Sequence, residues 1–209
     1  MTKRLRLSRL FAAAAAVAAL GALGATAASA RGLSTYSCPT SPTVEPFVNW
    51  GDTGDYFLGP AGSFEGTLTG WTAKGGPKIV SGNETFYVNS PTDSHSLSLP
   101  NGSSLASPSI CVTTNTPDLR LFVLNKGKSS KLNINMTYTD ANAKAHTVTV
   151  AQVTGGGSWS PIAPVNFLQN ISSLAATNGC TWVTFTFGPA DKNGTWQIDD
   201  FYVDPVKHH

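Results

Sequence analysis

The chain has 209 residues, of which 41% are hydrophobic and only 12% are charged. Its fourteen Lys and Arg residues and twelve Asp and Glu residues form no long basic or acidic block outside the N-terminal segment. Sparse, evenly spread charge forms no basic surface that would bind a nucleic acid or an anionic membrane, so we expect neither as a partner.

Residues 1–30 have the organisation of a secretion signal. Four basic residues precede an apolar run from Leu10 to about Leu23, and the small residues Ala28-Ser29-Ala30 follow it. The run is too short and too rich in Ala and Gly to span a membrane comfortably. We therefore expect cleavage near residue 30, a secreted protein with no membrane insertion, and ten basic against twelve acidic residues, a net charge of about −2.

Residues 31–60 are interpreted as an N-terminal extension. The sequence from residue 31 to Pro46 is rich in Ser, Thr and Pro, which is typical of coil. Two short apolar runs, 47–50 and 56–58, follow and are expected to dock onto the main domain. The turn between them contains Asp52 and Asp55, but the full pattern of a twelve-residue calcium loop is missing, so we interpret both as solvated turn acids.

Three cysteines, Cys38, Cys111 and Cys180, allow one disulfide and leave one thiol. An exported chain tolerates disulfides. We favour Cys38–Cys111, because that bond would tie an N-terminal segment of weak strand character to the core. Which cysteine stays unpaired is left open, and Cys180 opens an apolar strand where it can be buried as a small hydrophobic residue.

From Trp71 onward the pattern predicts β-strands almost throughout. Apolar and β-branched runs are separated by Asn-Gly, Gly-Gly, Ser-Pro and Lys-Gly breakers, and no window has sustained helical periodicity. We expect an all-β, two-sheet antiparallel jelly-roll β-sandwich over residues 61–205, with a tail at 206–209. The predicted strands are 70–74, 78–81, 85–89, 95–99, 103–112, 119–125, 132–139, 146–153, 159–167, 182–187 and 197–203.

Three of these strands alternate between apolar and polar residues, so each should bury one face and expose the other. The polar faces carry Asn, Thr and one large indole, Trp182. An indole can stack on a pyranose ring while fixed polar groups bind its hydroxyls. The candidate carbohydrate-binding residues are Trp182, Arg120, Asn133, Asn135 and Thr137. The alternative is an ordinary solvated sheet with Trp182 covered by the N-terminal segment.

The two ends of the main domain resemble a known family. Gly62-Ser-Phe-Glu-Gly66, followed by Gly70-Trp71, and the closing Ile198-Asp-Asp-Phe-Tyr-Val203 are similar to the ends of bacterial carbohydrate-binding jelly-roll modules. These modules belong to the galactose-binding-like superfamily. The resemblance covers residues 61–204 and extends to small secreted actinobacterial proteins of unassigned role.

The resemblance implies a structural calcium ion between the early turn and the last strand. It assigns Glu65 and one of Asp199 and Asp200 as side-chain ligands, with backbone carbonyls near Ser63 and Asp93. Calcium binds six to eight hard oxygens, and a carboxylate inside a buried strand is costly unless it is paired or metal-bound. In the alternative, Glu65 pairs with a Lys, or the two aspartates cap a turn at a strand end.

The sequence therefore predicts a secreted, non-catalytic carbohydrate-binding protein with a structural calcium site. The first alternative is a structural or cell-surface β-sandwich without a small ligand, and the second is an unrecognised hydrolase. A glycosidase needs two facing carboxylates, and no such pair stands out once Glu65 and an aspartate are assigned to a metal. The glycan and the oligomeric state are not specified by the sequence.

Overall fold

The computed structural model describes residues 41–113, 118–127, 131–140, 142–170, 181–191 and 194–204. The described residues all lie in one compact unit of the chain, Thr35–His209. No α-helix occurs among them, and two short 3₁₀ turns, η1 (Val48–Trp50) and η2 (Leu168–Asn170), are the helical elements there. None of the described helical turns could cross a membrane. The predicted signal at residues 1–30 and the tail at 206–209 lie outside the described residues.

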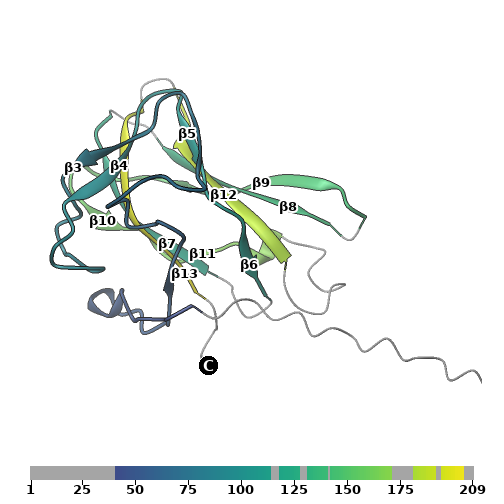
Figure 1. Ribbon diagram of the computed structural model, residues 1–209, viewed down its shortest axis with the longest axis horizontal. Coiled ribbons are helices and arrows are strands. Elements are labelled where there is room, and N and C mark those ends of the chain that lie inside the picture. The colour runs from purple at the N-terminus through teal and green to yellow at the C-terminus, as the bar shows by residue number, and fades with distance from the viewer. Residues whose placement is uncertain are drawn as a thin grey trace, which may run out of the picture. The chain divides into compact units, whose positions relative to one another are not determined.

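The first sheet has seven strands with the order β10-β7-β13-β4-β3 along its main path (Figure 1). The last strand, β13, lies in its middle, between β7 and β4, and all pairings are antiparallel. Two short strands join its sides, β1 on β13 and β11 on β7. The strands are β1 (Phe57–Leu58), β3 (Lys78–Ser81), β4 (His95–Leu99), β7 (Asp118–Asn125), β10 (Ser160–Pro161), β11 (Val165–Asn166) and β13 (Trp196–Val203).

The second sheet has six strands in the order β2-β5-β12-β8-β9, with β6 also paired to β12. Its pairings are antiparallel as well. Its strands are β2 (Thr72–Lys74), β5 (Ser104–Ala106), β6 (Ile110–Val112), β8 (Leu132–Thr139), β9 (Ala145–Val153) and β12 (Thr181–Pro189). Two antiparallel sheets confirm the predicted jelly-roll sandwich.

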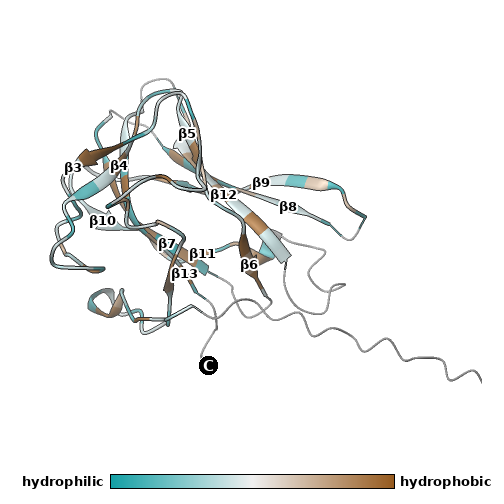
Figure 2. Ribbon diagram, viewed as in Figure 1, coloured by the Kyte–Doolittle hydropathy of each residue, from teal (hydrophilic) through white to brown (hydrophobic). Residues whose placement is uncertain are grey.

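The core lies between the two sheets and follows from the alternation in the strands. Ile134 and Met136 of β8 and Phe185 and Phe187 of β12 are fully buried, whereas the residues between them are not. Figure 2 shows hydrophobic and hydrophilic residues alternating along β12 and β9. β13 differs, because all eight of its residues are buried. Its outward-facing residues must therefore be covered by another part of the chain.

The N-terminal extension supplies part of that cover, as predicted. Phe47 and Tyr56 form a second buried cluster with Phe122 of β7 and Tyr202 of β13. The ring centroids of Phe47 and Phe122 are 5.7 Å apart, and Val44 pairs with Tyr56 by backbone hydrogen bonds of 2.8 and 2.9 Å. The extension is thus packed on the outer side of the first sheet.

Three predicted strands were wrong in whole or in part. Residues 103–112 split into β5 and β6, and residues 159–167 split into β10 and β11, because prolines interrupt both runs. Residues 85–89 form no strand at all. There the Glu84 carboxylate accepts the backbone N–H groups of Phe86 and Val88, which curls the segment into a loop.

Candidate functional site

A polar surface covers the side of the second sheet that faces away from the core. We call it the Trp182 face. On β12 it comprises Trp182, Thr184 and Thr186, and register places the β8 residues beside them: Thr184 pairs with Thr137 and Thr186 with Asn135. The face continues onto β9, and its members are Trp182, Thr184, Thr186, Asn133, Asn135, Thr137, Thr147, Thr149 and Gln152.

The polar side chains of this face hold one another in place. Thr149 donates to Asn135 Oδ1 at 2.8 Å, and Gln152 donates to Asn133 Oδ1 at 3.0 Å. The hydroxyls of Thr137 and Thr147 lie 2.9 Å apart. Each pair joins β8 to β9 across the strands, which fixes the rotamers of the side chains that a ligand would meet. The sequence prediction thus placed Asn133, Asn135 and Thr137 correctly on one surface.

Trp182 stands at one end of this face with 46% of its surface exposed. An indole exposed to this extent can present its flat apolar face to a ligand. The described part of the N-terminal extension packs on the first sheet, against Phe122 and Tyr202. Residues 41–58 therefore do not form the cover over Trp182 that the alternative interpretation required.

The prediction that Arg120 belongs to this face is wrong. Arg120 lies on β7, in the other sheet, and is only 4% exposed. Its guanidinium donates to Asp52 at 2.6 Å and to the Ile162 carbonyl at 2.9 Å, and lies 4.0 Å from the centre of the Phe47 ring. Arg120 shares its side of β7 with Phe122 and Leu124, so this strand does not alternate cleanly, and alternation alone does not tell which sheet a strand joins.

A second group of polar residues surrounds a β-bulge in β13. Asp199 pairs with Phe122 and Tyr202 with Arg120, so β13 advances three residues while β7 advances two. The extra residue allows both Ile198 and Phe201 to enter the core. Asp200 lies between them with φ of +46°, in the left-handed region that Asp tolerates better than most residues.

The turn that contains Gly62 and Ser63 contacts this bulge, as the resemblance implied. Gly59 donates to the Phe201 carbonyl at 2.7 Å, and Phe201 donates to the Gly62 carbonyl at 3.0 Å. A Cβ on Gly59 would lie 2.5 Å from the Phe201 ring, and one on Gly62 would lie 2.8 Å from the Phe201 carbonyl oxygen. Both glycines are therefore needed for the close approach. Ser63 follows Gly62 in the same turn.

The two aspartates of the bulge are fully buried but have different partners. Asp199 accepts the backbone N–H of Glu84 at 2.9 Å and that of Asp200 at 3.0 Å. Burial and repulsion from Asp200 raise the pKa of Asp199 to about 9, although these two amides act in the opposite direction. Asp199 is thus a structural acceptor that fastens residue 84 to the last strand.

Asp200 has no such partners, because neither of its carboxylate oxygens makes a hydrogen bond in the described structure. The Asn89 amide is near enough to lower its pKa slightly but does not reach hydrogen-bond geometry. Burial is the main cause that raises the pKa of Asp200 to about 8, and repulsion from Glu84, Asp93 and Glu65 adds to it. A buried carboxylate without a hydrogen-bond partner and among like charges is costly unless it is neutralised.

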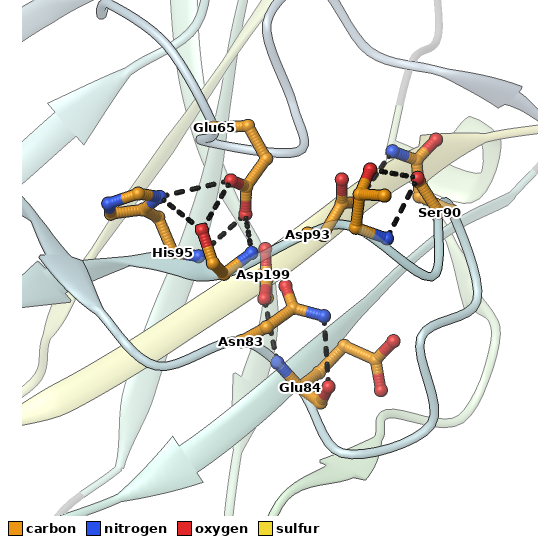
Figure 3. Close-up of polar contacts among 10 residues, drawn as sticks. Glu65, Asn83, Glu84, Ser90, Asp93, His95 and Asp199 are labelled. Atoms are coloured by element: carbon orange, nitrogen blue, oxygen red, sulfur yellow. Dashed lines mark hydrogen bonds and ion pairs between the residues drawn. The ribbon is translucent and has the colours of Figure 1, made fainter.

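Glu65 lies at the edge of this group and is well supplied with donors. Its carboxylate accepts the backbone N–H groups of Ser94 at 2.7 Å and His95 at 2.6 Å, and His95 Nδ1 lies 3.0 Å from it. Burial opposes ionisation of Glu65, but the hydrogen bonds from His95 and Ser94 outweigh it and lower the pKa. Figure 3 shows Glu65, Asp93 and Asp199 lying around one region from three separate segments.

The sequence interpretation missed Glu84, which is fully buried beside the aspartates. Its carboxylate accepts the N–H groups of Phe86 at 2.5 Å and Val88 at 2.6 Å. Burial raises its pKa, and the amides of the loop oppose that rise. The loop leaves Tyr87 with φ of +53° and 51% exposed. The only sequence signal was a lone acid after Gly82-Asn83, which is equally typical of a solvated turn.

The donor set around Asp200 suits a hard cation such as calcium. The negative charges of Glu84, Asp93 and Glu65 all act on the Asp200 carboxylate and raise its pKa. In the described part of the chain, no three His, Cys, Asp or Glu side chains form a metal site on their own. Main-chain carbonyls would have to complete the shell, which calcium accepts readily.

The predicted Cys38–Cys111 disulfide stays a prediction. Cys111 is buried on β6, and no free cysteine is found in the part of the chain that the structure describes. Cys38 and Cys180 both lie outside the described residues.

No protein-family model and no curated protein sequence matches the chain. Several solved carbohydrate-binding modules are similar in structure. The CBM22-1 xylan-binding domain from Paenibacillus barcinonensis Xyn10C is 18% identical with a TM-score of 0.47, over 70% of this chain and 93% of that one. CtCBM11 is 14% identical with a TM-score of 0.46, over 73% and 96%.

TmCBM61, solved in complex with β-1,4-galactotriose, is 16% identical with a TM-score of 0.40, over 68% of this chain and 94% of that one. These three similar structures are carbohydrate-binding modules, and the enzymatically active domain of bacteriophage CBA120 tailspike protein 4 is also similar, with a TM-score of 0.46. At these identities and TM-scores the similarity does not assign a ligand to this chain.

Proposed function

We propose that this chain is a secreted, non-catalytic carbohydrate-binding protein whose ligand site is the Trp182 face. The observation that carries the proposal is a half-exposed indole beside a surface of Thr, Asn and Gln side chains held by cross-strand hydrogen bonds. A pyranose has an apolar face, which an indole covers, and a ring of hydroxyls, which amides and hydroxyls bind. Both requirements are met on one surface.

The described strands of the second sheet supply none of the carboxylates that glycoside hydrolysis needs. Hydrolysis uses two carboxylates that flank the scissile bond. None of the six strands of the second sheet contains an Asp or a Glu. A glycan on the Trp182 face would therefore meet hydrogen-bonding groups and an aromatic platform, but no carboxylate from these strands.

Affinity electrophoresis through gels that contain soluble glucans, xylans, mannans or galactans tests the proposal. We expect retardation by at least one neutral polysaccharide, a clear decrease of that retardation in Trp182→Ala, and no release of reducing ends. Tyr87→Ala is the matched control, because Tyr87 is an equally exposed aromatic residue on the loop after Glu84, away from β12. Normal mobility in every gel would contradict the proposal.

We also propose that calcium stabilises the contact between the early turn and β13. Asp200 and Glu65 would hold the ion with their carboxylates, together with main-chain carbonyls near Ser63 and Asp93. The support is the buried, unpartnered carboxylate of Asp200 among like charges. Both oxygens of Asp199 already accept backbone N–H groups, and both oxygens of Glu65 also have hydrogen-bond partners. Asp200 is therefore the main ligand of the proposed ion. The ion would supply charge neutralisation, and the site has no catalytic part.

A further inference from the structure

A pocket of about 740 Å³ opens on the outer side of the first sheet, where the N-terminal extension packs. Its walls come from the turn that contains Trp50 and Asp52 and from the segment that contains Pro161 and Ala163. Asp118 and Arg120 of β7 and Asp204 also line it. The volume is typical of small-molecule sites. The pocket is separate from the Trp182 face, which belongs to the other sheet.

The polar groups of this pocket are fixed before any ligand arrives. Arg120 donates to Asp52 at 2.6 Å and to the Ile162 carbonyl at 2.9 Å. Asp52 also accepts the Tyr56 hydroxyl at 2.8 Å and the Gly54 N–H at 3.0 Å. The prediction that Asp52 is a solvated turn acid is therefore wrong. Arg120 and Asp52 cancel each other's charge, and the hydrogen bonds from Arg120, Tyr56 and Gly54 fix the position of the Asp52 carboxylate.

An aromatic wall completes the pocket. Trp50 lies at its edge and is only partly buried. The indole is held by edge contacts with Phe86 at 4.9 Å and Phe122 at 5.4 Å between ring centroids. A ring fixed on these sides and open toward a pocket is preorganised to stack on a flat apolar surface.

We infer that this pocket is a second carbohydrate site, which binds one uncharged sugar residue between Trp50 and the Arg120–Asp52–Tyr56 group. Trp50 covers the apolar face of the sugar, and the fixed polar groups bind its hydroxyls. Asp52 neutralises Arg120, and the acids Asp118 and Asp204 also line the pocket, so its walls offer no net positive charge to a uronic acid or a sulfated sugar. The inference rests on the proposed function for its ligand class, but its residues are independent of the Trp182 face.

Indole N–H signals in ¹⁵N-tryptophan-labelled protein test the inference, because the chain has only five Trp residues. Trp50→Phe and Trp182→Phe assign the two signals of interest. Cello-, xylo- and manno-hexaose are the neutral probes, and oligogalacturonate is the anionic comparator. We expect a neutral hexaose to shift both signals with separate saturation curves, and oligogalacturonate to leave Trp50 unchanged.

Ala163 offers a blocking variant, because it lines the pocket and is exposed. Ala163→Phe should raise the dissociation constant read from Trp50 at least tenfold and leave the Trp182 curve unchanged, whereas Ala163→Ser should change neither. A hexaose that saturates Trp182 while Trp50 stays still would overturn the inference and leave the proposed function standing. A response of Trp50 alone would support the pocket and count against the Trp182 face. If neither indole signal shifts with any hexaose, both the pocket and the Trp182 face are rejected as carbohydrate sites.

Discussion

Replacing Asp200 with Asn gives the sharpest test of the calcium proposal, because the change keeps the shape of the side chain and its tolerance for positive φ. In the calcium-free fold the pKa of Asp200 is raised from 3.8 to about 8. At 1.36 kcal/mol per pKa unit, retaining this carboxyl at pH 7 costs up to about 4 kcal/mol. Asn removes this cost, but its buried amide would lack hydrogen-bond partners, which reduces the gain in stability by about 1–3 kcal/mol.

The variant should therefore be more stable than the wild type in EDTA at pH 7, by about 1–3 kcal/mol. Calcium at a hundred times its dissociation constant should stabilise the wild type by about 2.7 kcal/mol and hardly affect the variant. Urea denaturation with and without calcium measures both values. Glu45→Gln, at an exposed acid, should behave as the wild type does. A variant destabilised equally in EDTA and in calcium would refute the reasoning.

Three further predictions concern the rest of the chain. Ala61 has φ of +51°, so Ala61→Gly should raise the free energy of unfolding by about 0.5–1 kcal/mol in urea denaturation, and a loss would contradict the strain. If Cys38 pairs with Cys111, Cys38→Ser should lower the free energy of unfolding by up to about 4 kcal/mol, and Cys180→Ser should lower it far less. If thermal unfolding shows the larger loss for Cys180→Ser, Cys180 is the partner of Cys111. Hydrogen bonds from Gly54, Tyr56 and Arg120 outweigh burial and lower the pKa of Asp52. The ionised carboxylate therefore stabilises the fold above about pH 4, and this stabilisation is lost as the pH falls through the lowered pKa. Acid titration of Asp52→Asn should show a smaller loss of stability, and an unchanged curve would contradict the pairing.

The sheets could be predicted because their strands alternate cleanly. β8 and β12 place Ile134 and Phe185 inside and Asn135 and Thr184 outside, and this period of two fixes the buried face wherever the strands end up. Strand neighbours are not fixed in this way. Arg120 has the right parity for a polar face, yet β7 pairs with β13 and its outer face is covered by the extension.

The bulge was only partly predictable. Asp199 and Asp200 inside an apolar strand indicated a special site, and the spacing of Ile198, Phe201 and Val203 already departs from strict alternation. Glu84 could not be assigned, because its burial depends on the Asp199 carboxylate, 115 residues away in the chain. Long-range pairing of this kind leaves no local pattern.

Isothermal titration with the glycan that retards the protein most strongly tests the central claim directly. We predict a measurable heat of binding for the wild type and a loss of at least tenfold in affinity for Trp182→Ala, with the free energy of unfolding unchanged. Equal affinities for the two proteins would contradict the claim that the Trp182 face binds carbohydrate.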